Sequence, residues 1–241
     1  MSTLHDIALS DLVATNSAAA RVLDRYGLDY CCHGRRTLRD ACESAALAVD
    51  DVVAELSESE PGTPAWMDLS LADLADHIVA THHAYLHTEL PLLDALAAKV
   101  ASVHGGRHPE LNEVRRLVAE IRADLEPHLL KEERILFPAI GALTGGQRDF
   151  PFGTIANPVR MMLVEHDRTG ELLSELRETS GGFAVPDDGC ASYRSLYERL
   201  AALEHDTHVH VHKENHVLFP AAVALYDADH PRTAKPLVDQ A

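Results

Sequence analysis

The sequence predicts an all-α protein whose main part is an up-down-up-down four-helix bundle. No segment of strand length alternates apolar and polar residues with a period of two. Aromatic residues make up only 5% of the 241 residues, whereas Ala and Leu are abundant, and this composition favours helix packing over a β-sandwich. Four long segments with helical spacing of apolar residues are joined by short loops, which is the organisation of a bundle.

The first part of the chain, residues 1–58, is expected to form a small domain of short helices. Asn16 can cap a helix that ends before Gly27, because Gly is a common residue after a helix C-terminus. Thr37 begins a sequence that resembles a capping box, and Asp50 starts a third helix. A domain of this size seldom folds robustly alone. It is therefore expected to pack on the rest of the chain or on a second copy in a homodimer.

A linker and the bundle follow this domain. Polar residues and helix breakers indicate a linker at 59–68. The bundle is expected to span 69–228, with its long helices at about 70–103, 109–143, 155–179 and 191–226. The remaining residues, 229–241, contain two prolines and are expected to form a frayed tail.

One motif occurs twice in the bundle, in its second and fourth helices. The pattern D-x-x-x-H-x-x-K-E-x-x-x-L-F-P begins at Asp124 and again at Asp206. Side chains four residues apart lie on the same face of a helix, so a His and a Glu at this spacing can bind one ion. The repeat therefore predicts two halves of a dinuclear metal site, with the ligands His128, Glu132, His210 and Glu214.

The first and third helices should each add a histidine at a similar depth. The third helix offers His166, whereas the first offers four that spacing does not separate: His77, His82, His83 and His87. Nitrogen and oxygen ligands without thiolate favour iron or manganese over structural zinc, although they leave zinc open. No Glu has a His three residues later, which excludes the Glu-x-x-His pattern of ferritin-like di-iron proteins.

Carboxylates beside the ligands are expected to assist them. Asp124 and Asp206 lie one turn before the ligand His of each motif copy, and Glu165 directly precedes His166. Such carboxylates orient imidazoles and can pass on protons or an outgoing cation. Gly170, one turn after His166, has no side chain that could coordinate, so a small molecule is expected to reach the metal there.

The fourth helix also contains three histidines on the side opposite His210. Their positions are about 160 to 200° around the helix from that ligand. We expect a solvent-exposed stripe formed by His208, His212 and His216.

Charge and cysteine usage limit the partners and the compartment. The formal net charge of −17 argues against binding to nucleic acid or to an anionic membrane. No stretch reaches the roughly 20 apolar residues of a membrane span, and no secretory leader is recognisable. The four cysteines form no C-x-x-C pair and no disulfide framework, so a reduced, cytoplasmic protein is expected.

With these residues in place, the chain resembles the RIC (repair of iron centres) family of di-iron proteins, the ScdA/YtfE type. Asp29-Tyr-Cys-Cys-His-Gly34 is similar to the family's N-terminal cysteine motif, with His33 in place of a Gly. The repeated motif, Glu165-His166-Asp, and Asp76-His-Ile with His83 after it resemble the family's haemerythrin-like bundle. The resemblance implies six metal ligands and selects His83 among the four candidates: His83, His128, Glu132, His166, His210 and Glu214.

The resemblance also implies a cofactor and an activity. The cofactor is two iron ions, bridged by carboxylates and by an oxo or hydroxo group. We expect one metal at His83 with His128, the other at His166 with His210, and the two glutamates between them. The implied activity is repair of iron–sulfur clusters damaged by nitric oxide or peroxide, through supply of iron to iron–sulfur client proteins.

The two adjacent cysteines of the N-terminal motif are expected to be functional. Cys31 and Cys32 are candidate thiols that receive iron, contact a cluster or take part in redox exchange, and His33 could add a ligand. Small ligands expected at the metal are nitric oxide, O2 or peroxide.

Two other function classes fit the same bundle. A haemerythrin-like protein that binds or senses O2 or nitric oxide needs only the metal site and gives the cysteines no task. A di-iron enzyme that reduces nitric oxide or peroxide would show multiple turnovers with an added reductant, whereas a repair protein should lose iron to an acceptor.

Overall fold

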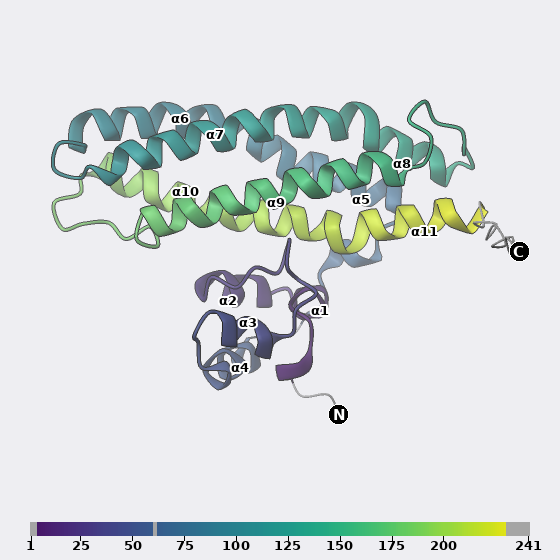
Figure 1. Ribbon diagram of the computed structural model, residues 1–241, viewed down its shortest axis with the longest axis horizontal. Coiled ribbons are helices and arrows are strands. Elements are labelled where there is room, and N and C mark those ends of the chain that lie inside the picture. The colour runs from purple at the N-terminus through teal and green to yellow at the C-terminus, as the bar shows by residue number, and fades with distance from the viewer. Residues whose placement is uncertain (1–3, 60–61, 230–241) are drawn as a thin grey trace, which may run out of the picture.

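The computed structural model describes residues 4–59 and 62–229, and within them the chain is helical (Figure 1). No strand forms among these residues, and a single antiparallel bridge joins Ala8 to Thr37. The prediction of an all-α protein is confirmed. Of the expected tail at 229–241, all residues after 229 lie outside the described part.

Four short helices form the N-terminal unit, which lies on one side of the bundle in Figure 1. The Thr37 side chain accepts a hydrogen bond from the backbone N–H of Asp40, so the expected cap is present at the third of these helices. The apolar cluster of this unit includes Val211 from the bundle, so the unit completes its core against the larger part of the chain. The helices are α1 (Leu9–Thr15), α2 (Ala19–Arg25), α3 (Leu38–Ser44) and α4 (Val49–Glu58).

The bundle consists of four long helical rods, three of which contain a π-helical segment, labelled η3, η4 or η5. A 3-10 turn, η2 (Ala65–Asp68), precedes them within the expected linker. The first rod is α5 (Leu71–Ile78), η3 (Val79–His83) and α6 (Ala84–His104), and the second is α7 (Glu110–Lys131), η4 (Glu132–Leu136) and α8 (Phe137–Thr144). The third is α9 (Ala156–Thr179), and the fourth is α10 (Ala191–Lys213), η5 (Glu214–Leu218) and α11 (Phe219–Asp229).

The π-helical segments were not predicted from the sequence. Pro138 follows η4 and Pro220 follows η5 at the same spacing. A proline has no N–H to donate to the carbonyl four residues earlier, so a widened turn before it avoids part of that mismatch. Each π segment contains one of the six predicted ligands: His83, Glu132 or Glu214.

A polar layer divides the apolar core of the bundle. On one side lies a Leu-rich cluster that includes Leu86, Leu129 and Leu203. On the other side lies a second cluster that includes Ile78 and Leu218. The predicted His and Glu ligands occur between these clusters along every rod, which places them deep inside the bundle.

In residues 4–59 and 62–229, no helix combines the length and the apolar composition needed to cross a bilayer.

Candidate metal centre

The six predicted ligands are buried together in the polar layer. Each side chain belongs to a residue with at most 2% of its surface exposed. His87, the rival of His83 in the first rod, has a side chain that is 41% exposed. The structure therefore brings together His83, His128, Glu132, His166, His210 and Glu214.

These residues form two groups that share both carboxylates. His83 and His210 make one pair, with their Nε2 atoms 3.1 Å apart. His128 and His166 make the other, also with 3.1 Å between the Nε2 atoms. Each pair has potential ligand atoms within 4.8 Å of those of Glu132 and Glu214.

The expected pairing of the histidines was wrong. We expected His83 with His128 and His166 with His210, which follows the order of the rods in the sequence. Instead the first rod shares its pair with the fourth, and the second with the third. Every rod of an up-down bundle has two neighbours, so chain order does not decide which neighbour a histidine faces.

Each carboxylate reaches one histidine of each pair. Glu132 Oε2 lies 3.3 Å from His128 Nε2 and 3.5 Å from His83 Nε2. Glu214 Oε1 lies 2.9 Å from His210 Nε2, and its Oε2 lies 3.2 Å from His166 Nε2. Each glutamate can therefore contribute to both groups of potential ligand atoms.

The charges of the layer fit cations. Within the described residues, both carboxylate oxygens of Glu132 and Oε2 of Glu214 are buried without a hydrogen-bond partner. Buried carboxylates need a cation or a strong donor, because desolvation penalises an unpaired charge. Burial lowers the pKa of His128, but the carboxylates of Glu132, Glu165 and Glu214 together outweigh it and raise this pKa to about 10. Burial also lowers the pKa of His83, but Glu132 and other carboxylates raise it overall. Without a metal, protons on His83 and His128 therefore supply positive charge.

Three side chains orient the ligand imidazoles through their Nδ1 atoms. Nδ1 of His83 is 3.0 Å from Glu133 Oε1, and Nδ1 of His128 is 2.9 Å from Glu165 Oε2. Such contacts place the proton on Nδ1 and leave Nε2 free to bind a metal. The hydrogen bond from His128 lowers the pKa of Glu165 to about 2.

The third of these contacts joins His166 to the second motif copy. His166 Nδ1 lies 2.7 Å from Asn215 Oδ1. Asn215 directly follows Glu214, just as Glu133 directly follows Glu132. The role of Glu133 and Asn215 was not predicted. Their equivalent positions in the two motif copies could have indicated it.

The three predicted assisting carboxylates differ in their partners. Glu165, expected to orient a ligand imidazole, contacts that of His128. Asp124 accepts from Arg168 at 3.4 Å, and Asp206 lies 2.8 Å from Nδ1 of His82. Each step of four residues turns a side chain by about 40° around the helix. Asp124 and Asp206 are thus close in direction to the candidate ligands of their helices, but the partners of their hydrogen bonds are Arg168 and His82.

The lysines of the motif also differ between the copies. Lys131 Nζ is 2.5 Å from Glu165, near the surface. Lys213 is buried and donates to Nε2 of His82 at 2.7 Å and of His77 at 3.0 Å. Burial lowers the pKa of Lys213 to about 8.

The second motif copy is covered by the N-terminal unit. His208 Nδ1 is 2.8 Å from Asp24, and His216 Nε2 donates to the Cys31 carbonyl at 2.8 Å. His212 is fully buried. The prediction of a solvent-exposed histidine stripe was wrong, because these side chains form the contact between the two parts of the chain.

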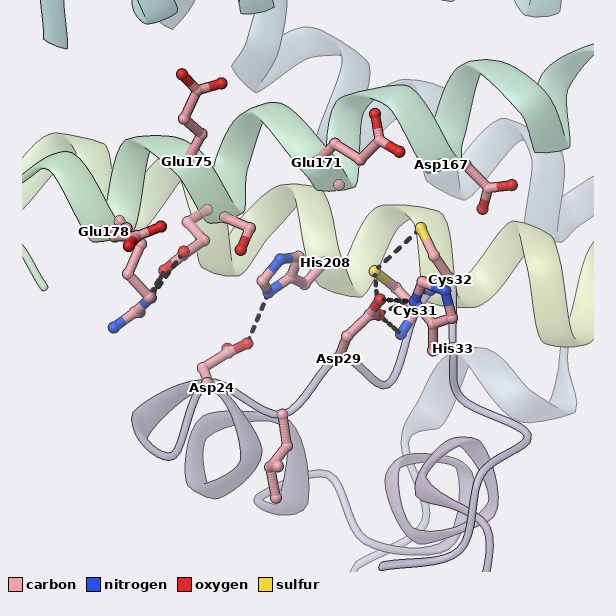
Figure 2. A pocket seen from close by; sticks show the side chains of 16 residues that line it. Asp24, Asp29, Cys31, Cys32, His33, Asp167, Glu171, Glu175, Glu178 and His208 are labelled. Carbon is pink, nitrogen blue, oxygen red and sulfur yellow. Dashed lines mark hydrogen bonds and ion pairs between the residues drawn. The ribbon is translucent and has the colours of Figure 1, made fainter. Parts of the chain in front are cut away.

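A pocket of about 640 Å³ opens beside the two cysteines (Figure 2). Cys31 Sγ lies 3.2 Å from Asp29 Oδ1 and 3.7 Å from Cys32 Sγ. Cys32 Sγ in turn is 3.5 Å from the backbone oxygen of the ligand His166. Carboxylates of α9 line the opposite wall: Asp167, Glu171, Glu175 and Glu178.

A cysteine lies close to Gly170, which itself lines this pocket. A Cβ atom built on Gly170 would lie 3.3 Å from Cys32 Sγ. The missing side chain therefore makes room for Cys32, and it allows the N-terminal unit to approach the helix that carries His166.

The fold and the site define a helical-bundle protein with a buried His/Glu site for cations. The Hemerythrin HHE cation binding domain matches residues 74–231, and a domain of unknown function (ScdA_N, DUF542) matches residues 5–60. "Iron-sulfur cluster repair protein YtfE" of Enterobacter sp. (strain 638) is 33% identical over 222 residues, which cover 91% of this chain and 98% of that protein. The proteins of the same name from Escherichia coli O1:K1 / APEC and Escherichia fergusonii are 32% identical over the same shares.

The chain therefore belongs to the haemerythrin HHE family and, within it, to the iron–sulfur cluster repair proteins of the YtfE type. This confirms the family that the sequence motifs indicated.

Proposed function

We propose that the polar layer holds two iron ions and that the protein supplies this iron to damaged iron–sulfur clusters. The observation that carries the proposal is the pair of buried glutamates. Each has a carboxylate oxygen within 3.5 Å of one histidine in each of the two pairs. The names of the relatives, which describe iron–sulfur cluster repair, support the activity.

The residues divide the work by their chemistry. The four imidazoles would offer one Nε2 atom each, and Glu132 and Glu214, which belong to both groups, would be shared between the two ions. A site with nitrogen and oxygen donors and no thiolate suits iron better than it suits structural zinc. When iron leaves, His83 and His128 take up protons, because their pKa values are raised in the metal-free layer by the nearby carboxylates despite burial. Uptake of protons stabilises the metal-free state and makes release reversible.

The cysteine pair is proposed as the site that receives iron on its way out. Asp29, Cys31 and Cys32 have potential ligand atoms within 4.8 Å of one another. The contact with Cys32, together with burial, raises the pKa of Cys31 well above its usual range, so this thiol ionises only when a cation displaces its proton. The carboxylates along α9 favour cations in the adjoining pocket.

The test is transfer of iron to a client protein. The protein is loaded with Fe(II) without oxygen and mixed with an iron–sulfur enzyme whose cluster nitric oxide has damaged. We expect labelled iron to appear in the client as its activity returns, and we expect slower transfer from the Cys31→Ser/Cys32→Ser variant. Cys42→Ser, a buried cysteine of the same unit, is the matched control.

Two results would contradict the proposal. Retention of all iron by the loaded protein while the client stays inactive would contradict the supply of iron. Reversible binding of nitric oxide or O2 by the loaded protein would then favour a binding or sensing function. Equal transfer rates in the double cysteine variant and the control would remove the role of the cysteines alone.

A further inference from the structure

A second cysteine site lies at the end of the bundle, remote from the polar layer. Cys190 is exposed and occupies the N-cap position of α10, a helix of 23 residues. His210 lies 20 residues further along this helix, which corresponds to about 30 Å at 1.5 Å per residue. Cys190 is therefore independent of the metal centre and of the Cys31 pocket.

A buried histidine is aimed at the sulfur of Cys190. His104, the last residue of α6, is 6% exposed, and its Nε2 lies 3.1 Å from Cys190 Sγ. The ring packs edge-on against Tyr193, with 5.6 Å between ring centroids, which fixes its direction. Nδ1 of His104 is buried and has no hydrogen-bond partner within the described residues. The sulfur is thus the polar group that the imidazole faces.

The surroundings of Cys190 favour a negative charge on its sulfur. The backbone N–H of Tyr193 in the first turn of α10 lowers the pKa of Cys190, and Lys99 adds a smaller effect of the same sign. The other charged groups at this end pair mainly with one another: Arg107 and His108 with Asp188, and Glu110 with His108.

Two cysteines of the N-terminal unit differ from Cys190 in exposure and in the direction of the pKa shift. Cys31 and Cys42 are buried, and burial contributes to raising the pKa of both thiols. A nucleophilic cysteine requires access and a stabilised thiolate, and a neighbouring imidazole or a helix N-terminus supplies the second condition. Cys190 has the access, the imidazole and the helix N-terminus together.

We propose that Cys190 is a nucleophilic thiolate, oriented by His104, and a modification site for low-molecular-weight disulfides. The Cys190 sulfur attacks one sulfur of the disulfide, and the bond between the two disulfide sulfurs breaks. A mixed disulfide forms at Cys190, and the other half leaves as a thiolate that takes a proton from water. Because the reagent is itself the oxidant, no further electron acceptor is needed.

The test is the site and the rate of reaction with 2,2′-dithiodipyridine, a neutral disulfide, on the metal-loaded full-length protein. With less than one equivalent of reagent, we expect peptide mass mapping to find the modification at Cys190. The fast phase should disappear in Cys190→Ser and persist in Cys31→Ser/Cys32→Ser. Modification of Cys31 or Cys32 first, or a fast phase that survives Cys190→Ser, would overturn the proposal.

The role of the imidazole is read from the pH–rate profile. His104→Phe keeps a ring against Tyr193 but removes the nitrogens, and we expect the midpoint of the profile to rise by about one pH unit. That corresponds to roughly tenfold less thiolate at a pH below the midpoint. An unchanged midpoint in a variant with the wild-type circular dichroism spectrum would exclude His104 as the orienting group.

Discussion

The two copies of the repeated motif have the same ligands and different surroundings. In the first copy, Glu133 bonds the imidazole of His83, and Lys131 pairs with a carboxylate near the surface. In the second copy, Asn215 bonds His166 and also donates to the Cys31 carbonyl at 3.1 Å, beneath the N-terminal unit. The pattern sets the positions of the ligands, whereas the surroundings set their basicity and their access.

This difference also appears within each candidate metal position. One pair combines His83, backed by a carboxylate, with His210, whose buried Nδ1 has no partner within the described residues. The other combines His128, backed by Glu165, with the amide-backed His166. A carboxylate partner makes an imidazole a stronger donor, so each position has one stronger and one weaker nitrogen ligand.

The largest effect should come from removing the ligand histidine of either copy. We expect His128→Ala and His210→Ala each to weaken Fe(II) binding by more than about 100-fold, beyond the usual effect of an outer partner. Anaerobic competition with a chelator measures this affinity. Asp124→Ala is the matched control, because its side chain pairs with Arg168 and should leave affinity unchanged. A large loss in one copy only would break the equivalence of the two motif copies.

A smaller effect should separate the partners of the imidazoles. Glu133→Gln and Glu165→Gln replace the charged partners of His83 and His128 with neutral ones. We expect each to weaken metal binding by about 10- to 100-fold. Asn215→Ala should cost less, because it removes a neutral partner of His166. Equal losses in all three variants would show that the charge of the partner does not matter.

Protons should compete with the metal. Because the pKa of His128 is raised to about 10 in the metal-free layer, this imidazole is protonated at neutral pH and must lose its proton to bind iron. We expect affinity to fall by about tenfold for each unit of decreasing pH and each proton displaced. Chelator competition between pH 8 and about pH 6 measures the slope, and a flat profile would argue against protonated histidines in the metal-free site.

The smallest effect should come from weakening the contact between the N-terminal unit and the helix of the second motif copy. Asp24 accepts from His205 and His208, and its side chain is 10% exposed. Asp24→Asn should destabilise the protein by about 1 to 2 kcal/mol, since it weakens hydrogen bonds to a buried charge. Thermal unfolding measures the loss, with Asp50→Asn, whose side chain is 88% exposed, as control. Similar unfolding temperatures for both variants would mean that Asp24 does not hold the N-terminal unit.

The parts of this structure that follow local rules were predictable. The third long helix was expected at about 155–179 and is found at Ala156–Thr179. His and Glu four residues apart share a helix face whatever the rest of the chain does, so the proximity of the candidate ligands His128 and Glu132 could be predicted from spacing alone.

The parts of the structure that depend on packing between distant segments could not be predicted from the sequence. Spacing could not show that His83 faces His210 across the bundle, or that the N-terminal unit covers His212. The expected role of Asp124 shows another limit of spacing. Asp124 lies four residues before His128, but its side chain accepts a hydrogen bond from Arg168. The contact of Cys32 with the helix of His166 is also a long-range one.

Metal stoichiometry tests the central claim most directly. The protein is loaded with Fe(II) without oxygen, freed of unbound metal and analysed for iron per chain, beside Glu132→Ala and Glu214→Ala. Because each glutamate reaches both histidine pairs, we predict about two irons in the wild type and a loss from both positions in either variant. Two irons retained in both variants would contradict a site bridged by these carboxylates, and a single iron in the wild type would contradict a dinuclear centre.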